Sequence, residues 1–223
     1  MTAMTAPNAA TTASAAGGLD HAGRPRGASR FWRELGYLLA GLPVGIAAFT
    51  VVVTGLSVGV SAVVLVVGLP LLAGTLAAAR GFAGWERRRL AAVTGQPPRA
   101  PRYVEREGHG LARTRQALRD GQAWRDVLHA VASFPIRVLT FSLALTWTLG
   151  GLGELLYATW SWPIPRDDNA GLLDLMFGID SRLADIAFNM GIGVVLLATA
   201  VPMVRGLAAL QAGVAHGLLT PAE

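Results

Sequence analysis

The sequence predicts an all-α membrane protein with about four transmembrane helices, arranged as two hairpins that repeat in parallel. Two observations lead to this fold class. Of the 223 residues, 52% are hydrophobic and 15% are charged, whereas a soluble domain usually carries about 25% charged residues. In addition, residues 35–79 contain no Asp, Glu, Lys, Arg or His. Because one bilayer crossing needs roughly 20 apolar residues, this run alone is long enough for two crossings.

The four crossings follow from the hydrophobic runs and the residues that interrupt them. The first begins at an interfacial segment around Trp32 and ends near residues 54–59, whose glycines permit a tight turn. The second returns to Ala79, the third covers residues 138–162 and the fourth covers residues 186–204. Because residues 44–79 are slightly short for two crossings, we expect the first helix to begin before Pro43 and to kink there.

The remaining segments define the domain organisation. Residues 1–29 are rich in Ala, Thr and Gly and lack periodic apolar positions, so we expect a disordered cytoplasmic tail. Residues 30–219 form the membrane domain. It divides into a first repeat (30–93), an Arg-rich cytoplasmic linker (94–119) and a second repeat (120–219) that contains an outer loop (161–182).

The distribution of charge predicts the orientation. Residues 80–134 contain eleven Arg, whereas the outer loop contains two Arg and four Asp. Because positively charged loops stay in the cytoplasm, we expect a multi-pass protein of the plasma membrane with both termini cytoplasmic. The run from Arg87 to Arg89 is interpreted as a topology anchor. The net charge of +5 fits contact with anionic lipid, and no nucleic-acid partner is expected.

An internal repeat underlies the two hairpins. At one constant offset, a Trp-Arg-acid motif and a later proline occur twice, and the second helix of each half matches at a larger offset because of the outer loop. We therefore predict two copies of one unit, each an interfacial helix, a proline turn, an outward crossing and a return. The motif residues are Trp32, Arg33, Glu34 and Pro43, matched by Trp124, Arg125, Asp126 and Pro135; in the second helices Pro70, Gly74, Ala77 and Gly81 match Pro202, Gly206, Ala209 and Gly213.

Polar residues near the outer surface are the candidate sensing site. Glu154 is the one acid well inside a predicted crossing, and acids within a membrane are costly and often functional. Asp185 and Asn189 enter the fourth helix from the same side, so the three are expected to form a polar cluster, with Arg166 or Arg182 as a partner. The alternative is that Glu154 reaches the outer interface or caps nearby backbone. Residues 172–177 have the spacing of a short amphipathic helix on the outer leaflet.

No pattern in the sequence favours an enzyme. There is no Cys, and the four His are dispersed, none at ligand or triad spacing with acids, Ser or another His. Neither a phosphate-binding loop nor a GxSxG motif occurs. We therefore expect no catalytic residue, no metal and no cofactor.

A family signal comes from several segments, namely residues 31–43, 68–72 and 78–83, followed by Trp124-Arg125-Asp126 and Pro135. Together these segments resemble the sensor domain of actinobacterial sensor histidine kinases. The resemblance implies a membrane input module of a two-component system. This sequence contains no phosphoacceptor His motif and no ATP-binding boxes, so autokinase activity is not implied. We expect a non-enzymatic sensory domain that contacts membrane lipids, forms homo- or hetero-oligomers and signals to a cytoplasmic partner such as a histidine kinase.

Two other functions fit parts of the pattern. Parallel repeats, membrane prolines and Glu154 also suit a small transporter or transporter subunit. A structural module that assembles other membrane proteins would need none of the polar residues. Glu154-dependent flux would indicate the transporter, and an associated kinase would indicate the sensor.

Overall fold

The computed structural model describes residues 26–65, 67–95, 103, 111–163, 171–179 and 181–219, and within these ranges it contains helices and turns but no strand. Most of the predicted tail, much of the linker and the middle of the outer loop lie outside the described residues. The elements are α2 (Arg26–Ser61), the 3-10 turn η1 (Val63–Leu65), α3 (Gly68–Thr94), α4 (Leu111–Arg119), α5 (Gly121–Leu145), the π-helical turn η2 (Thr146–Gly150), α6 (Gly151–Leu155), α7 (Tyr157–Trp160), α8 (Leu172–Phe177) and α9 (Arg182–Leu219).

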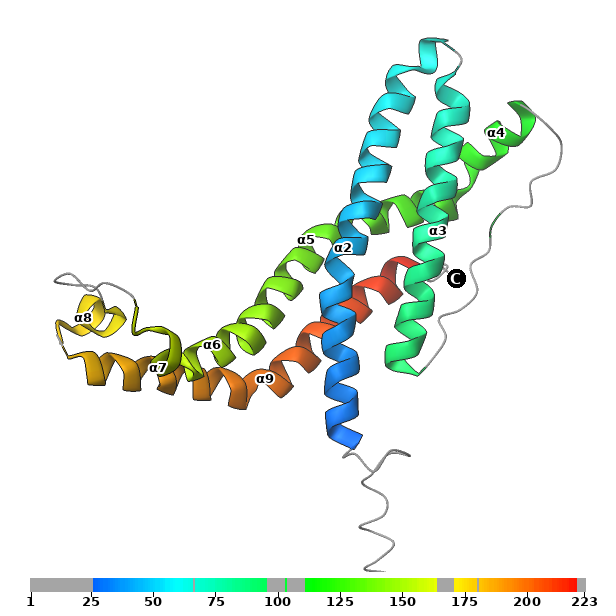
Figure 1. The fold of residues 1–223 in the computed structure, drawn as a ribbon. Coiled ribbons are helices and arrows are strands. Elements are labelled where there is room, and N and C mark those ends of the chain that lie inside the picture. Colours follow the sequence, from blue (N-terminus) through cyan, green and yellow to red (C-terminus); the bar gives the residue numbers. More distant parts are fainter. Residues whose placement is uncertain are drawn as a thin grey trace, which may run out of the picture.

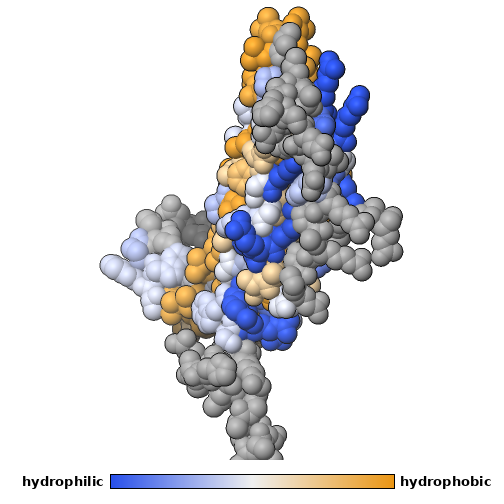
Figure 2. Space-filling model, turned by 90° about the vertical axis from the view of Figure 1, so that its right-hand side faces the viewer, coloured by the Kyte–Doolittle hydropathy of each residue, from blue (hydrophilic) through white to orange (hydrophobic). Residues whose placement is uncertain are grey.

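The long helices form two crossed hairpins (Figure 1). Helices α2 and α3 make the first, and the continuous segment α5 to α7 with α9 makes the second. Helix α2 contacts both α5 and α9 where the hairpins cross, while the tip of the first hairpin and the α8 end of the second point in different directions. Apolar side chains gather at the tip of the first hairpin, and strongly hydrophilic ones lie below it (Figure 2).

Three helical segments are long and apolar enough to cross a membrane, namely Ser29–Ser61, Gly121–Leu155 and Arg182–Leu219. They contain the predicted first crossing, most of the third and the whole fourth. The predicted second crossing is not among them. Only residues 68–79 of α3 precede its first charge, Arg80, and they rise about 18 Å at ~1.5 Å per residue, against a hydrocarbon core of roughly 30 Å.

The helices continue through Pro43 and Pro135, so the predicted proline turns are wrong, whereas the expectation that the first helix begins before Pro43 is confirmed. Helix α2 includes Pro43, and α5 includes Pro135, so the segments before them are not separate interfacial helices. A proline removes one intrahelical hydrogen bond, and packing against neighbouring helices compensates for it. The start of α5 is set by Asp120, whose carboxylate accepts a hydrogen bond from the Gln122 amide at 3.0 Å, as an N-cap residue does.

Glycines allow close packing within each hairpin. A Cβ placed on Gly55 of α2 would collide with the Thr75 side chain of α3, and one on Gly193 of α9 would collide with the backbone of Leu155. Small residues at such contacts let membrane helices approach closely without loss of hydrogen bonds. The hairpins are therefore tightly paired away from the crossing as well as at it.

The two hairpins bury corresponding positions. Positions in α2 and α5 are related by an offset of 92 residues, and positions in α3 and α9 by one of 132. The pairs in which both residues are buried are Glu34–Asp126, Leu35–Val127, Tyr37–His129, Leu38–Ala130, Gly41–Ser133, Gly45–Arg137, Ala48–Thr140, Val52–Ala144, Gly68–Ala200, Leu72–Val204, Thr75–Leu207, Leu76–Ala208, Ala79–Gln211, Ala83–Ala215 and Arg87–Leu219.

Candidate functional site

A cluster of charged and polar side chains, most of them buried or half-buried, lies where the hairpins cross, and we call it the hub. It draws on α2, α3, α5 and the linker, with α9 contributing backbone and one arginine. Its members are Glu34, Tyr37, Arg80, Glu86, Arg87, Arg89, Tyr103, Asp120, Asp126, His129, Arg137 and Arg205. Buried ionic groups are retained only when they are paired, so the contacts of each member decide what the hub can do.

Glu86 is the centre of the first half of the hub and is only 2% exposed. Its Oε1 accepts a hydrogen bond from the Tyr37 hydroxyl at 2.9 Å. Its Oε2 lies 3.1 Å from Nη1 of Arg89, one turn away on α3, and 3.2 Å from Nη2 of Arg137 on α5. Arg137 also donates to the Gly41 carbonyl of α2 at 3.2 Å. One carboxylate thus joins α2, α3 and α5.

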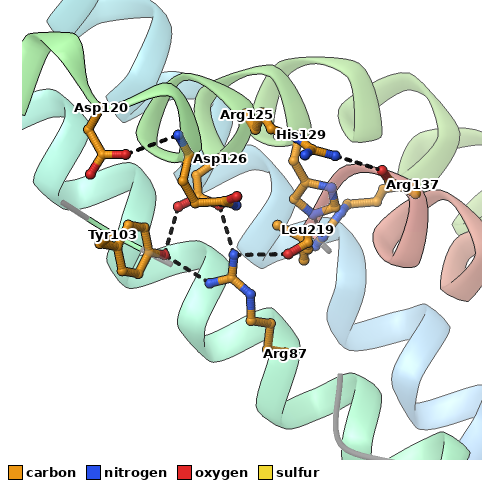
Figure 3. Close-up of polar contacts among 10 residues, drawn as sticks. Arg87, Tyr103, Asp120, Arg125, Asp126, His129, Arg137 and Leu219 are labelled. Atoms are coloured by element: carbon orange, nitrogen blue, oxygen red, sulfur yellow. Dashed lines mark hydrogen bonds and ion pairs between the residues drawn. The ribbon is translucent and has the colours of Figure 1, made fainter. Parts of the chain in front are cut away.

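Arg87 and Asp126 form the second half of the hub (Figure 3). Nη2 of Arg87 lies 2.9 Å from Asp126 Oδ1 and donates to the Leu219 carbonyl of α9 at 3.4 Å. The Tyr103 hydroxyl accepts from Arg87 Nη1 at 3.0 Å and donates to Asp126 Oδ2 at 2.8 Å. Burial and this bond to Asp126 raise the pKa of Tyr103, so it stays a neutral donor. This pair joins α3, α5, α9 and the linker.

Two further contacts surround these pairs. Arg80 lies 2.5 Å from Asp120, and its guanidinium stands 4.6 Å from the centre of the Tyr103 ring. Glu34 of α2 lies 2.7 Å from Arg30 and 3.9 Å from Arg205 of α9. The Tyr103 side chain is therefore held by two arginines and one aspartate, and α2 has an ionic link to α9.

The chemistry of the hub suits a joint between helices. The carboxylates of Glu86 and Asp126 each bind guanidinium and hydroxyl groups. Removing one partner of a buried ion pair costs roughly 3–5 kcal/mol because the other charge is left buried and uncompensated. The helices that share these pairs are therefore held in one relative arrangement, and a change in that arrangement must break or exchange pairs.

The repeat motif residues separate into two groups in the structure. Glu34 and Asp126, the acids of the two motifs, are both buried in the hub. Trp32 and Trp124 are exposed, at 67% and 42%. Arg33 is exposed, whereas Arg125 donates to the Gly217 carbonyl of α9 at 3.3 Å. Pro43 and Pro135 are both exposed on their helices.

The residues of the predicted outer cluster are only partly brought together. Asp185 is 2% exposed and accepts hydrogen bonds from Asn189 Nδ2 at 3.2 Å, from the Tyr157 hydroxyl at 3.3 Å and from the Leu173 amide at 3.3 Å. None of these bonds involves Glu154. Glu154 is partly buried on α6, and its Oε2 has no hydrogen-bond partner among the described residues. Arg166 lies outside the described residues, and helix α8 is present at residues 172–177 as expected.

Sequence reasoning missed Glu86, Arg87, His129 and Arg137 as site residues. Arg87 was read as part of a topology anchor, and Arg137 stands one position before the predicted third crossing. A usable signal was the helical spacing of Ala79, Ala83 and Leu90, buried apolar residues on α3 that share one face with Glu86 and Arg87. Charged residues on an apolar helix face require a buried partner. Within the described residues, no group of three His, Asp or Glu side chains is placed to hold a metal.

Comparison with known proteins matches the chain to a family. The sequence model of the family described as "Putative sensor" matches residues 37–219. This range covers most of the chain and contains the hub except Glu34. No curated protein and no solved structure matches the chain.

Proposed function

The chain belongs to the "Putative sensor" family, and from this premise we propose that it is a non-enzymatic sensory membrane domain. It passes a stimulus to a cytoplasmic partner such as a histidine kinase through its hub. The observation that carries the proposal is that one buried ionic cluster touches all four long helices. A stimulus that shifts either hairpin must then alter contacts shared with the other hairpin.

We propose that both hairpins cross the plasma membrane, which gives four crossings with both termini and the hub on the cytoplasmic side. Helix α3 begins at the tip of α2 and ends beside Tyr37, to whose carbonyl Arg89 donates at 2.6 Å. If α2 crosses, its antiparallel partner returns over the same distance. The 3-10 turn before α3 extends its short apolar stretch. The concentration of arginine around the hub supports this orientation.

We also propose that the two hairpins are copies of one unit, related by an axis along the membrane normal. The shared burial pattern of α2 with α5 and of α3 with α9 supports this. So do two contacts between the hairpins that join corresponding positions. A Cβ on Gly45 would lie 2.7 Å from Cδ of its counterpart Arg137, and Ala83 packs in one cluster with its counterpart Ala215. Corresponding residues meet each other at a two-fold axis.

Site-specific photo-crosslinking in native membranes tests the signalling role. A photoreactive residue at Arg33, exposed beside the hub, is expected to capture a cytoplasmic kinase, identified by mass spectrometry. The matched probe at Val64, 88% exposed at the tip of the first hairpin, should not. Introducing Arg137→Met should change the yield at Arg33. Capture of a partner by the probe at Val64 alone would contradict the proposal. So would a crosslinking yield at Arg33 that is the same with and without Arg137→Met. The same experiment reports capture of a second copy of the chain, which the expected oligomer requires.

A further inference from the structure

A groove on the first hairpin connects its apolar part to its basic part. It lies between α2 and α3, has a volume of about 470 Å³ and is lined by Val44, Ala78, Gly81, Phe82, Trp85 and Arg88. The groove is open to the surroundings of the hairpin and does not reach the buried pairs of the hub. It is therefore a separate feature from the hub and needs its own explanation.

The lining changes from apolar to basic along the groove. Val44 and Ala78 belong to the charge-free run of the sequence, while Trp85 and Arg88 lie on the part of α3 that faces the hub side. From Ala78 to Arg88 the helix rises about 15 Å at ~1.5 Å per residue. This distance spans the change from acyl chains to headgroups in one leaflet, where tryptophan and arginine are the usual anchors.

Arg88 differs from its two neighbours in the run of three arginines. Arg87 and Arg89 are held by carboxylates of the hub. Arg88 is exposed, and its Nε makes a long 3.4 Å bond to the Gly84 carbonyl of its own helix. No described carboxylate pairs with it. A cation at the polar end of an apolar groove is complementary to an anion that carries a hydrocarbon chain.

We propose that this groove binds one anionic phospholipid. An acyl chain lies along Val44, Ala78 and Phe82, over the space left by Gly81, where an added Cβ would meet no atom within 4 Å. The phosphate lies at Arg88 beside the indole of Trp85. This inference requires the first hairpin to be in the membrane but does not require the signalling role. One cation near a membrane surface corresponds to about a fivefold preference for anionic lipid.

Quenching of Trp85 fluorescence by brominated lipids tests the site directly. The full chain, with the other five tryptophans changed to Phe, is reconstituted in phosphatidylcholine vesicles that contain brominated phosphatidylglycerol or brominated phosphatidylcholine. We expect half-maximal quenching at about a fivefold lower mole fraction of the phosphatidylglycerol. Arg88→Gln should bring this ratio close to one. Arg182→Gln, an exposed arginine at the start of α9, should leave it unchanged.

Filling the groove gives a second, independent variant. Gly81→Leu should weaken quenching by both lipids, whereas Gly74→Leu, equally open on α3 but outside the groove, should not. Helical content by circular dichroism checks the fold of each variant. Equal quenching by both lipids in the parent, or a preference that survives Arg88→Gln, would overturn the proposal. Loss of the preference in millimolar inorganic phosphate would assign the site to a free anion and would overturn it as well.

Discussion

Substitution of Arg137 tests whether the hub holds the two hairpins together. Arg137 is 4% exposed, lies 3.2 Å from Glu86 and donates to the Gly41 carbonyl at 3.2 Å. Arg137→Met keeps much of the side-chain length and removes the charge. Loss of one partner of a buried pair usually costs about 3–5 kcal/mol. Because Glu86 keeps Arg89 and Tyr37 as partners, we expect a loss near the lower limit, about 3 kcal/mol of unfolding free energy.

The measurement is a reversible unfolding titration in detergent micelles, followed by tryptophan fluorescence. The matched control is Arg88→Met, which removes an exposed arginine from the same region and should cost less than about 1 kcal/mol. The double variant Glu86→Gln with Arg137→Met completes a double-mutant cycle. Because the two residues share one ion pair, the cycle should give an interaction energy of at least about 1 kcal/mol.

Two results would refute the reasoning. If Arg137→Met costs no more than Arg88→Met, the buried pair does not hold the hairpins. If the cost is large but the cycle with Glu86 shows no coupling, Arg137 contributes through packing or through its bond to the Gly41 carbonyl alone. In either case, the pair of Glu86 and Arg137 could not transmit a hairpin movement through ion-pair exchange.

Three further predictions use the same unfolding assay. Tyr103→Phe removes the hydroxyl that links Arg87 to Asp126, so we expect the free energy of unfolding to fall by about 1 kcal/mol. Trypsin should also cleave the linker faster, because the linker would be held less tightly to the hub. An unchanged cleavage rate would show that the Tyr103 hydroxyl does not hold the linker. Gly45→Ala should destabilise by about 1–3 kcal/mol, since its Cβ would crowd Arg137, whereas Gly36→Ala, in open space on the same helix, should stabilise by up to about 1 kcal/mol. The test is that the two variants change the free energy of unfolding in opposite directions. A change in the same direction would contradict the described crossing. Asp185→Asn should lower the free energy of unfolding by about 1–3 kcal/mol, because an amide nitrogen would face groups that donate hydrogen bonds to the carboxylate. An unchanged free energy of unfolding would mean that these bonds do not form.

The sequence predicts where this chain is helical better than it predicts where each helix begins and ends. The apolar character of a span is a local property, since it follows from one stretch of sequence such as the charge-free run of residues 35–79. The continuation of α2 through Pro43 is not local, because it depends on α5 and α9 packing against the helix. The same holds for the second crossing, where Arg80 interrupts the apolar run early and its partner Asp120 lies 40 positions away.

The candidate site could be predicted only in fragments, for the same physical reason. Glu34 and Asp126 were found through the repeated motif, although the motif alone does not say that they are buried. Arg87 and Arg137 appeared as charges at membrane boundaries, where exposure is the ordinary expectation. Their burial follows from the crossing of the hairpins, which brings Arg87 to Asp126 across 39 positions of sequence. A pairing at that separation has no local signature.

The position of the hub explains why it suits signal transmission better than the predicted outer cluster does. Asp185 and its partners Asn189, Tyr157 and Leu173 all belong to the second hairpin and its outer loop, so their bonds hold that hairpin to itself. A movement of the whole hairpin leaves such bonds intact. The pairs of Glu86 and Asp126 join residues of different hairpins, so they respond to a change in the crossing. On the proposed function, the outer cluster can receive a stimulus, and the hub, whose pairs join the two hairpins, can report it to the cytoplasmic side.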